Sequence, residues 1–405
     1  MRVAYVGPFA YPSSQANSLR VAGMVSALAA AGHQVLVGSM SQAPPGPADE
    51  YSDGERVSYL AEYEHGFLSS LAPGIRGLFL GDCTVSWLSQ LEEKPDLVIL
   101  YGVHLGYLWR LRRYCRREGI ALVLDVVEWY RARDLPGGRF GPFAIANELA
   151  MRFFAKSADG VIAISSFLER HFFNMGCRVL RVPPLLANAG FIPSKARARE
   201  SGLTKVCYVG SPGSKEALKA MFDGFRRAVE SGARIRLHFV GASLADIAAS
   251  LYAEDVTWLR SEESGVVFYG RLSNEAATQV VRGCDFSMTI RERERLVEAG
   301  FPFKVAEAAA HGTPTICNEF SDLRLYFADG ENAIFSESTD SASVCSALMR
   351  AAGMSDADVS RMSGAVQKVG KNEFSATAKS AAISRFLECC VAERQDPAAL
   401  NGRAE

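Results

Sequence analysis

The chain has 405 residues and a formal net charge of −1, and 48% of its residues are hydrophobic while 22% are charged. This length and composition predict a globular protein of two domains with sizeable cores, and the near-neutral charge gives no support for bulk binding of nucleic acid. The nine cysteines are scattered without a C-x-x-C spacing, so we expect reduced thiols in the cytoplasm. The longest apolar runs have the length of strands, far below the roughly 18 residues that a membrane-spanning helix needs.

The first 37 residues have the pattern of one βαβ unit. A buried strand at Val3–Val6 ends in Gly7, helical spacing extends over Leu19–Ala31, and a second strand follows at Val35–Val37. Such units build doubly wound parallel sheets, and a chain that begins with a strand is not expected to begin with a signal peptide. The turn after the first strand lacks G-x-G-x-x-G, which disfavours a nicotinamide or flavin site.

A basic helix is predicted at Arg110–Arg117, after a strand at Leu97–Leu100. Its arginines alternate with Trp109, Leu111 and Tyr114. This pattern fits a solvated helix surface, and it also fits an amphipathic helix that lies against anionic lipid headgroups. Peripheral contact with a membrane is therefore one of two expectations for this helix.

Carboxylates and aromatic rings follow the predicted strand that ends at Leu124. Asp125, Glu128, Trp129 and Tyr130 stand at its carboxyl end, where open α/β sheets build their sites. Aromatic rings beside carboxylates suit a sugar, which offers an apolar face and a rim of hydroxyls. The alternative for Glu128 is an ordinary surface or helix-capping acid.

A polar stretch at Ser194–Gly202 lacks the periodicity of a helix or a strand and predicts the boundary between two domains. We expect a first domain at residues 1–190 and a second at 200–374, followed by a last helix at about 375–395. Strands alternate with helical spacing on both sides of the boundary, so each part is predicted to be a doubly wound α/β domain.

A phosphate-binding turn is predicted after the strand Val206–Val209. Gly210, Ser211 and Gly213 precede Lys215, and a helix is expected to open there. Backbone N–H groups and the lysine ammonium would together neutralise part of a diphosphate. The turn does not match the Walker pattern G-x-x-x-x-G-K-[ST], and a solvated lysine on an ordinary strand-to-helix turn is the alternative.

The stretch Glu298–Cys317 combines a glycine turn, a helix and a strand. The turn at Gly300–Pro302 puts proline at the predicted first helical position, and Gly312 ends the helix. Free N–H groups at a helix start attract anions. Lys304 and Glu307, within the first two turns, suit a ligand with both phosphate and hydroxyls. The alternative is that these glycines and prolines only form the turns of an ordinary βαβ unit.

The run from Gly300 to Glu307, followed by Gly312–Pro314, resembles the donor-binding signature of retaining GT-B glycosyltransferases of the family 4 type. Glu298 and Glu307 bracket eight residues where that family usually has seven, and we carry no role over to Glu298. A sub-group typical of bacterial surface-polysaccharide clusters is more similar still. It has an arginine-rich segment before a Gly-Phe-Pro-x-Lys run, as at Arg291–Arg295, and a similar Asp-x-x-Glu-Trp-Tyr run.

The resemblance implies a GT-B fold, in which two Rossmann-like doubly wound α/β domains face each other across a cleft and the last helix packs back on the first domain. It implies catalytic roles for Asp125, Glu128, Lys215 and Arg291. The implied donor-binding residues are Gly210, Ser211, Gly213, Gly270, Arg271, Gly300, Phe301, Pro302, Lys304 and Glu307. The implied acceptor-side residues are Ser14, Arg20, His104, Trp129 and Tyr130, with a solvated helix position as the alternative for Arg20.

The resulting expectation is a retaining transferase that moves a sugar from a nucleotide diphosphate sugar to the hydroxyl of a sugar, lipid-linked or small-molecule acceptor, in bacterial polysaccharide or glycoconjugate synthesis. Fixed positive charge at the leaving diphosphate would make a metal or another cofactor unnecessary. We expect a cytoplasmic protein, associated with the inner face of the membrane if the basic helix touches lipid. The alternatives are a GT-B epimerase of nucleotide sugars and a catalytically inactive GT-B partner subunit.

Overall fold

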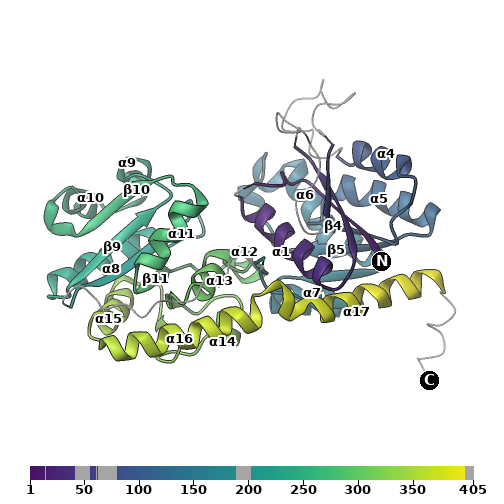
Figure 1. Ribbon diagram of the computed structural model, residues 1–405. Helices are drawn as coiled ribbons and strands as arrows, with labels where there is room; N and C mark the ends of the chain where they lie inside the picture. The colour runs from purple at the N-terminus through teal and green to yellow at the C-terminus, as the bar shows by residue number, and fades with distance from the viewer. Residues whose placement is uncertain (14, 42–54, 61, 63–79, 188–201, 397–405) are drawn as a thin grey trace. The chain divides into compact units, whose positions relative to one another are not determined.

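The computed structural model describes residues 1–13, 15–41, 55–60, 62, 80–187 and 202–396. These residues form two units (Figure 1). Unit 1 comprises Met1–Asn188, Ala299–Phe301 and Ser375–Glu405, and unit 2 comprises Ala189–Glu298 and Pro302–Phe374. Ser14, which we predicted on the acceptor side, lies outside the described residues, as does most of the predicted boundary stretch.

Unit 1 is built on a parallel sheet with the strand order β3-β2-β1-β4-β5-β6-β7. Its strands are β1 (Arg2–Val6), β2 (Gln34–Ser39), β3 (Glu55–Tyr59), β4 (Leu97–Tyr101), β5 (Ala121–Val126), β6 (Gly160–Ala163) and β7 (Val179–Arg181). In the centre, Val3 of β1 pairs with Val35 on one side and Leu97 on the other. The direction of winding reverses between β1 and β4, and sheets of this kind bind ligands beyond the carboxyl ends of the strands at such a reversal.

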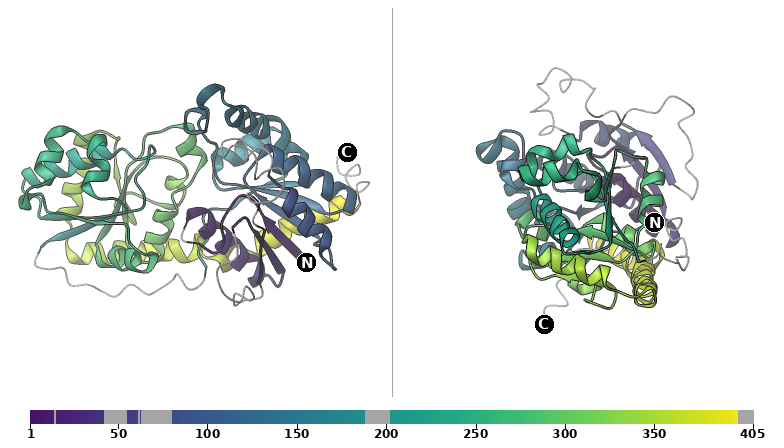
Figure 2. Two further views of the ribbon diagram at one scale, coloured as in Figure 1. Left: turned by 90° about the horizontal axis from the view of Figure 1, so that it is seen from above. Right: turned by 90° about the vertical axis from the view of Figure 1, so that its left-hand side faces the viewer.

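Helices cover both faces of this sheet (Figure 2), which explains why nearly every residue of its central strands β1, β4 and β5 is buried. They are α1 (Ala16–Ala30), α4 (Asp82–Gln90), α5 (Leu105–Glu118), α6 (Pro142–Leu149), α7 (Ser166–Asn174) and α17 (Ala376–Gln395). The last helix, α17, packs on α1, and its Ile383 and Leu387 are buried in the same cluster as Val21 and Leu28. Among the residues that the structure describes, no helix is long and apolar enough to cross a bilayer.

The predicted basic helix is α5, and its apolar side chains face the interior. Leu111 and Tyr114 are buried with Tyr107 and Leu108, while Arg113 and Arg116 are exposed. Trp109 is the large apolar side chain of α5 that remains exposed. Leu111 and Tyr114 are therefore unavailable for the lipid contact that the sequence pattern allowed.

Unit 2 repeats the same parallel topology, with the strand order β10-β9-β8-β11-β12-β13. Its strands are β8 (Thr204–Val209), β9 (Ile235–Val240), β10 (Val266–Gly270), β11 (Phe286–Thr289), β12 (Thr315–Asn318) and β13 (Ala333–Ser336). The winding reverses between β8 and β11, so the sequence motifs that follow these two strands are brought side by side.

The helices of unit 2 begin close to the predicted turns. They are α8 (Leu218–Glu230), α9 (Leu244–Ile247), α10 (Ala253–Leu259), α11 (Asn274–Gly283), α12 (Arg295–Ala299), α13 (Phe303–Ala310), α14 (Leu323–Tyr326), α15 (Ser341–Ala352) and α16 (Asp356–Glu373). Helix α8 begins at Leu218, later than the opening predicted at Lys215. Pro302 is the N-cap of α13 with an extended backbone, one residue before its predicted position. Gly312 has a φ of 70° and follows the end of α13, as predicted.

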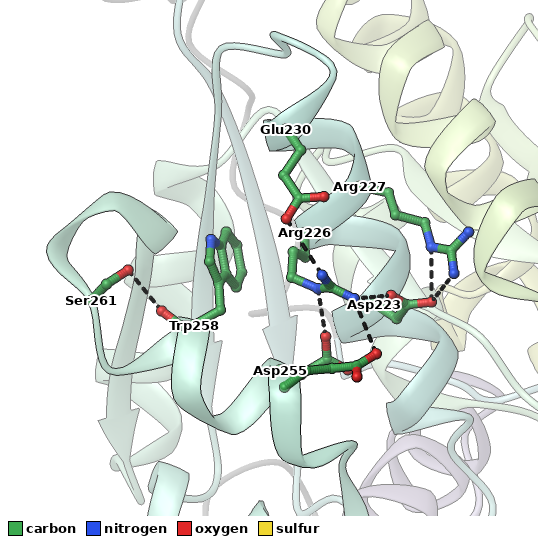
Figure 3. A network of polar contacts seen from close by, with 8 residues as sticks. Asp223, Arg226, Arg227, Glu230, Asp255, Trp258 and Ser261 are labelled. Atoms are coloured by element: carbon green, nitrogen blue, oxygen red, sulfur yellow. Dashed lines mark hydrogen bonds and ion pairs between the residues drawn. The ribbon is translucent and has the colours of Figure 1, made fainter.

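An ion-pair network fixes α10 on α8 (Figure 3). Arg226 donates from Nε to Asp255 at 2.8 Å and from its NH2 group to Asp223 at 2.7 Å. The Asp255 side chain is fully buried, so its charge needs this partner. Arg226 is the ninth residue of α8, roughly 12 Å along the helix axis from its first residue, so this network lies away from the loop before α8.

Candidate functional site

A carboxylate and two cations meet where the winding of unit 2 reverses. Glu216 precedes α8, Arg291 follows β11, and Lys304 lies in the first turn of α13. An NH2 nitrogen of Arg291 is 2.8 Å from Oε1 of Glu216, and Nζ of Lys304 is 3.1 Å from the same oxygen. The Glu216 side chain is 4% exposed. Burial alone would raise the pKa of this carboxyl, but Lys304 and Arg291 outweigh it and lower the pKa to about 2.

The second oxygen of Glu216 occupies the turn that we predicted for phosphate. Oε2 accepts the backbone N–H of Gly213 at 3.2 Å. The loop is further held by a backbone bridge between Glu216 and Arg291 and by the N–H of Ala217, which donates to Ile290 O at 2.9 Å. An internal carboxylate thus accepts from a backbone amide and two cations, a donor set that suits any anionic oxygen. The sequence analysis missed Glu216, and its position directly after Lys215 was the available signal.

Arg291 is held in place by groups on three elements. Its backbone N–H donates to Asn318 Oδ1 and its carbonyl accepts from Asn318 Nδ2, both at 2.9 Å. The guanidinium lies 5.6 Å from the ring centroid of Phe320. Its Nε is buried, and no described residue accepts a hydrogen bond from it. A buried N–H donor without a protein acceptor is uncommon and points to a ligand or a water at this position.

Lys304 approaches the end of β8 because residue 210 is glycine. Gly210 has a φ of 134°, and a Cβ atom there would lie 3.3 Å from Nζ of Lys304. The ammonium also lies 4.1 Å from the ring centroid of Tyr208. Burial lowers the pKa of Lys304 to about 8, with Arg291 and Lys215 acting in the same direction and Glu216 opposing them. Lys215 directly precedes Glu216 in the chain.

Glu307 lies one turn further along α13. Burial raises the pKa of its carboxyl to about 7, although the positive charge of Lys304 acts in the opposite direction. This carboxylate therefore changes its charge near neutral pH. Among the described residues, none donates a hydrogen bond to the side chain of Glu307.

The other predicted donor-side residues follow the ends of β8 and β10 or precede α13. Ser211 is exposed. Gly270 ends β10, where its carbonyl accepts the N–H of Gly241 at 2.7 Å, and Arg271 follows directly after the strand. Gly300 and Phe301 are buried and group with unit 1, whereas Pro302 groups with unit 2. The predicted turn at 300–302 is thus divided between the two units.

Unit 1 has a cavity of about 170 Å³ at the carboxyl ends of β1, β4 and β5. His104, Glu128 and Tyr130, three of the predicted acceptor-side or catalytic residues, lie in its wall. Apolar side chains complete much of the lining: Leu80, Leu135, Phe143 and Met151. The cavity therefore combines a few polar groups with apolar walls, as expected of a site for a sugar or another small ligand.

The polar groups of this cavity carry little positive charge. Burial lowers the pKa of His104 to about 4, so the imidazole is neutral at pH 7. Tyr130 is hydrogen-bonded to Glu128, and burial together with the negative charge of Glu128 raises the pKa of its phenol. A neutral imidazole, a carboxylate and a phenol provide both donors and acceptors for hydroxyl groups.

Asp125 and Arg20 do not reach the cavity, and we revise their predicted roles. Nε and an NH2 nitrogen of Arg20 donate to the two oxygens of Asp125 at 3.0 and 2.8 Å, and Tyr5 OH also donates to this carboxylate. Arg20 further donates to the carbonyls of Val182 and Pro183. Both charged side chains are buried. Asp125 joins α1 to the sheet and is a positioning residue, because a substrate cannot contact it here.

Trp129 also differs from its predicted acceptor-side role. Its side chain is buried, and its indole N–H donates to Glu148 at 3.0 Å. The ring lies 4.5 Å, centroid to centroid, from His171 and packs on α7. Of the two aromatic residues after Glu128, Tyr130 reaches the cavity and Trp129 belongs to the core.

Two family descriptions match consecutive parts of the chain. "Glycosyl transferase 4-like domain" matches residues 18–184, and "Glycosyl transferases group 1" matches residues 204–353. The first part lies within unit 1 and begins after its central strand β1, and the second part contains all six strands of the unit 2 sheet. No curated protein sequence matches the chain.

Solved glycosyltransferase structures share the fold at low sequence identity. Sucrose-phosphate synthase from Thermosynechococcus elongatus superposes with a TM-score of 0.72 at 16% identity, over 97% of this chain and 99% of that one. HepE from Anabaena in complex with UDP-glucose superposes with a TM-score of 0.66 at 14% identity, over 96% of this chain and 100% of that one. Trehalose 6-phosphate synthase from Burkholderia multivorans superposes with a TM-score of 0.65 at 13% identity, over 100% of this chain and 99% of that one. The two parallel sheets and these similarities establish the predicted GT-B fold. The chain is a glycosyltransferase and belongs to the family 4 type, with a Glycosyl transferase 4-like domain followed by a group 1 domain.

Proposed function

We propose that this enzyme transfers a sugar from a nucleotide diphosphate sugar to an acceptor hydroxyl, with retention of configuration at the anomeric carbon, in the synthesis of a polysaccharide or glycoconjugate. The observation that supports it most is the convergence of Gly213, Arg291 and Lys304 on one carboxylate at the strand ends of unit 2. Groups that hold a carboxylate in this way also suit the oxygens of a diphosphate.

In this proposal the donor half of the reaction depends on fixed charge. The departing diphosphate develops negative charge, and Lys215, Arg291 and Lys304 stabilise it without a change in their own positions. Arg291 offers its unpartnered Nε. Glu216 keeps Arg291 and Lys304 in place and acts as a positioning residue.

Glu307 is assigned to the ribose hydroxyls of the nucleotide. An ionised carboxylate accepts two hydroxyl donors at once, and none of the described protein groups competes for it. Gly270 and Arg271, at the end of β10, remain the candidates for contact with the base. The sequence motif assigns the turn at residues 300–302 to the sugar.

The acceptor is assigned to the cavity of unit 1. Glu128 would orient the reacting hydroxyl, with neutral His104 as a second hydrogen-bonding partner and Tyr130 holding the carboxylate. Retention is inferred from the family 4 signature at Gly300–Glu307. It requires that the acceptor hydroxyl approach the face of the sugar that the diphosphate leaves.

The first experiment is a thermal-shift screen of nucleotide sugars, beginning with UDP-glucose, with which HepE was solved. The donor that stabilises the protein is then incubated with and without candidate acceptors, and the anomeric configuration of the product is read by NMR. A product with retained configuration that forms only with acceptor supports the proposal. Conversion of the nucleotide sugar without acceptor would instead identify an epimerase, and an inverted product would overturn the mechanism.

A further inference from the structure

An exposed apolar surface lies on the helical segment that walls the cavity of unit 1. This segment comprises η2 (Gly138–Phe140), α6, the π-helical turn η3 (Ala150–Phe154) and η4 (Ala155–Ser157). The large apolar side chains that it exposes are Phe140, Ile145, Leu149, Phe153 and Phe154. Ile145, Leu149 and Phe153 are four residues apart and form one stripe along the helix. Their number and spacing distinguish this surface from the scattered apolar residues of an ordinary protein exterior.

The opposite face of the same helix lines the cavity. Phe143, Asn147 and Met151 are also spaced by four residues, and they face the proposed acceptor site. The helix therefore separates the cavity from the exposed stripe. A surface that binds the exposed stripe would lie next to the acceptor site.

Basic residues surround the stripe. Residues 131–157 contain five basic side chains (Arg131, Arg133, Arg139, Arg152 and Lys156) and two acidic ones (Asp134 and Glu148), which gives a net charge of 5 − 2 = +3. Both acids are engaged within the segment, Asp134 with Arg131 and Glu148 with Arg152. The exposed Arg139 and Lys156 remain near opposite ends of the apolar stripe. Apolar side chains flanked by cations on a helix that lies at the surface are the pattern of interfacial membrane binding.

We propose that this face, defined by Phe140, Ile145, Leu149, Phe153 and Phe154 with Arg139 and Lys156, is a docking surface for an anionic lipid bilayer. The apolar side chains enter the boundary between headgroups and acyl chains, and the cations contact anionic headgroups. A bilayer is favoured over a protein partner because one surface supplies both requirements, an apolar layer beneath negative charge. This docking surface does not depend on the donor chemistry proposed above.

The test is co-sedimentation of the whole chain with vesicles of phosphatidylcholine containing about one quarter phosphatidylglycerol, compared with pure phosphatidylcholine. We expect the protein to bind the anionic vesicles, and the double variant Ile145→Ser/Phe153→Ser to lower the partition coefficient by roughly tenfold or more. The double variant Arg139→Glu/Lys156→Glu should weaken binding to the anionic vesicles and leave the weak binding to pure phosphatidylcholine unchanged.

Leu325 in unit 2 offers a matched control, because its exposure of 58% equals that of Phe153. Leu325→Ser should bind vesicles like the unchanged protein. A Trp109→Ser variant tests the basic helix α5 in the same assay, and we expect a smaller loss from it than from the Ile145/Phe153 pair. The proposal is overturned if the unchanged protein stays in the supernatant, if Leu325→Ser reduces binding equally, or if the Ile145/Phe153 variant abolishes a protein dimer and leaves vesicle binding intact. Donor binding by thermal shift does not involve this face, so failure here leaves the proposed function standing.

Discussion

The strand ends of the two units have the same topology but opposite chemistry. In unit 2 the winding reversal brings Arg291 and Lys304 onto the buried carboxylate of Glu216, which Lys215 directly precedes in the chain. In unit 1 the equivalent reversal opens into a cavity with apolar walls, the neutral imidazole of His104 and the carboxylate of Glu128. Fixed charge suits a leaving diphosphate, whereas hydroxyls are better recognised by neutral hydrogen-bonding groups and one carboxylate. One fold thus provides two different sites through the residues that follow its strands.

The contrast predicts that substitutions in the two regions affect different kinetic constants. Glu128→Ala should lower transfer roughly 100-fold or more while donor affinity stays nearly constant, because the residue meets the acceptor or the transition state. Lys215→Ala should weaken donor binding as well as turnover. Calorimetry with the donor nucleotide and initial rates of transfer measure the two effects separately. Near-normal transfer by Glu128→Ala would remove the acceptor assignment and return the search to His104.

A second prediction separates the donor cluster from an ordinary buried ion pair. The pKa of Glu216 is about 2 in the folded protein and about 4.5 when unfolded, so its ionised form contributes about 3 kcal/mol to the free energy of unfolding. Because the folded pKa is the lower one, this contribution is present above pH 4.5 and is lost as the pH falls towards 2. We therefore expect that the free energy of unfolding of Glu216→Gln, measured with urea, does not show this loss between pH 4.5 and 2.

Asp255→Asn is the matched control, since Asp255 is also a buried carboxylate 2.8 Å from an arginine. In contrast to Glu216, Asp255 has a pKa above its ordinary value. Burial raises this pKa, Arg226 acts in the opposite direction, and the negative charges of Asp223 and Glu254 raise it further. Asp255→Asn should therefore still lose free energy of unfolding as the pH falls from 4.5 towards 2, because Glu216 is intact in this variant. Equal acid profiles for the two variants would mean that Arg291 and Lys304 do not act on Glu216 as the geometry indicates.

Glu307→Gln tests the ribose assignment at a smaller effect. Charge-assisted hydrogen bonds contribute roughly 1.5–3 kcal/mol, so nucleotide affinity should fall about 10- to 150-fold with the fold intact. In the unchanged enzyme, affinity for the nucleotide sugar should also rise as the pH passes through about 7, where Glu307 ionises, and fall above about 8, where Lys304 loses its proton. The nucleotide sugar is the suitable ligand, because a terminal phosphate titrates in the same range. Calorimetry in which Glu307→Gln keeps both its affinity and the rise near pH 7 would refute the assignment.

The sequence pattern was sufficient for the fold because hydrophobic periodicity and glycine turns are local signals. The strand before Gly210, the glycine after α13 and the polar residues at strand ends could all be read within a few neighbouring residues. Contacts between residues that are distant in the sequence could not be predicted in this way. The pairing of Glu216 with Arg291 spans 75 residues, and that of Arg20 with Asp125 spans 105. A lone sequence gives no register for such pairs, so a buried structural carboxylate and one that faces a ligand look alike.

The same limit applies to amphipathic helices. The arginine-rich spacing of α5 fitted both a solvated and a lipid-facing surface, because periodicity identifies an apolar face without saying what covers it. In α5 that face is covered by the core, whereas the stripe at Ile145, Leu149 and Phe153 is exposed. A stripe interrupted by a π-helical turn is also weaker as a periodic signal, since its residues per turn change within the segment.

The smallest expected effect concerns divalent ions, and it follows from the charge of the donor cluster. A metal at a nucleotide diphosphate bridges phosphate oxygens and neutralises the leaving group. Lys215, Arg291 and Lys304 together bring three positive charges to this position, of which Glu216 neutralises one. The remaining charge matches that of a divalent ion, so turnover in EDTA should equal turnover in buffer within experimental error.

The comparison is most informative with Lys215→Ala, whose cluster has one positive charge fewer. Stimulation of that variant by manganese, with no stimulation of the unchanged enzyme, would show that the cations perform the task of a metal. Loss of turnover in EDTA by the unchanged enzyme, restored by manganese, would show instead that the lysines and Arg291 do not suffice.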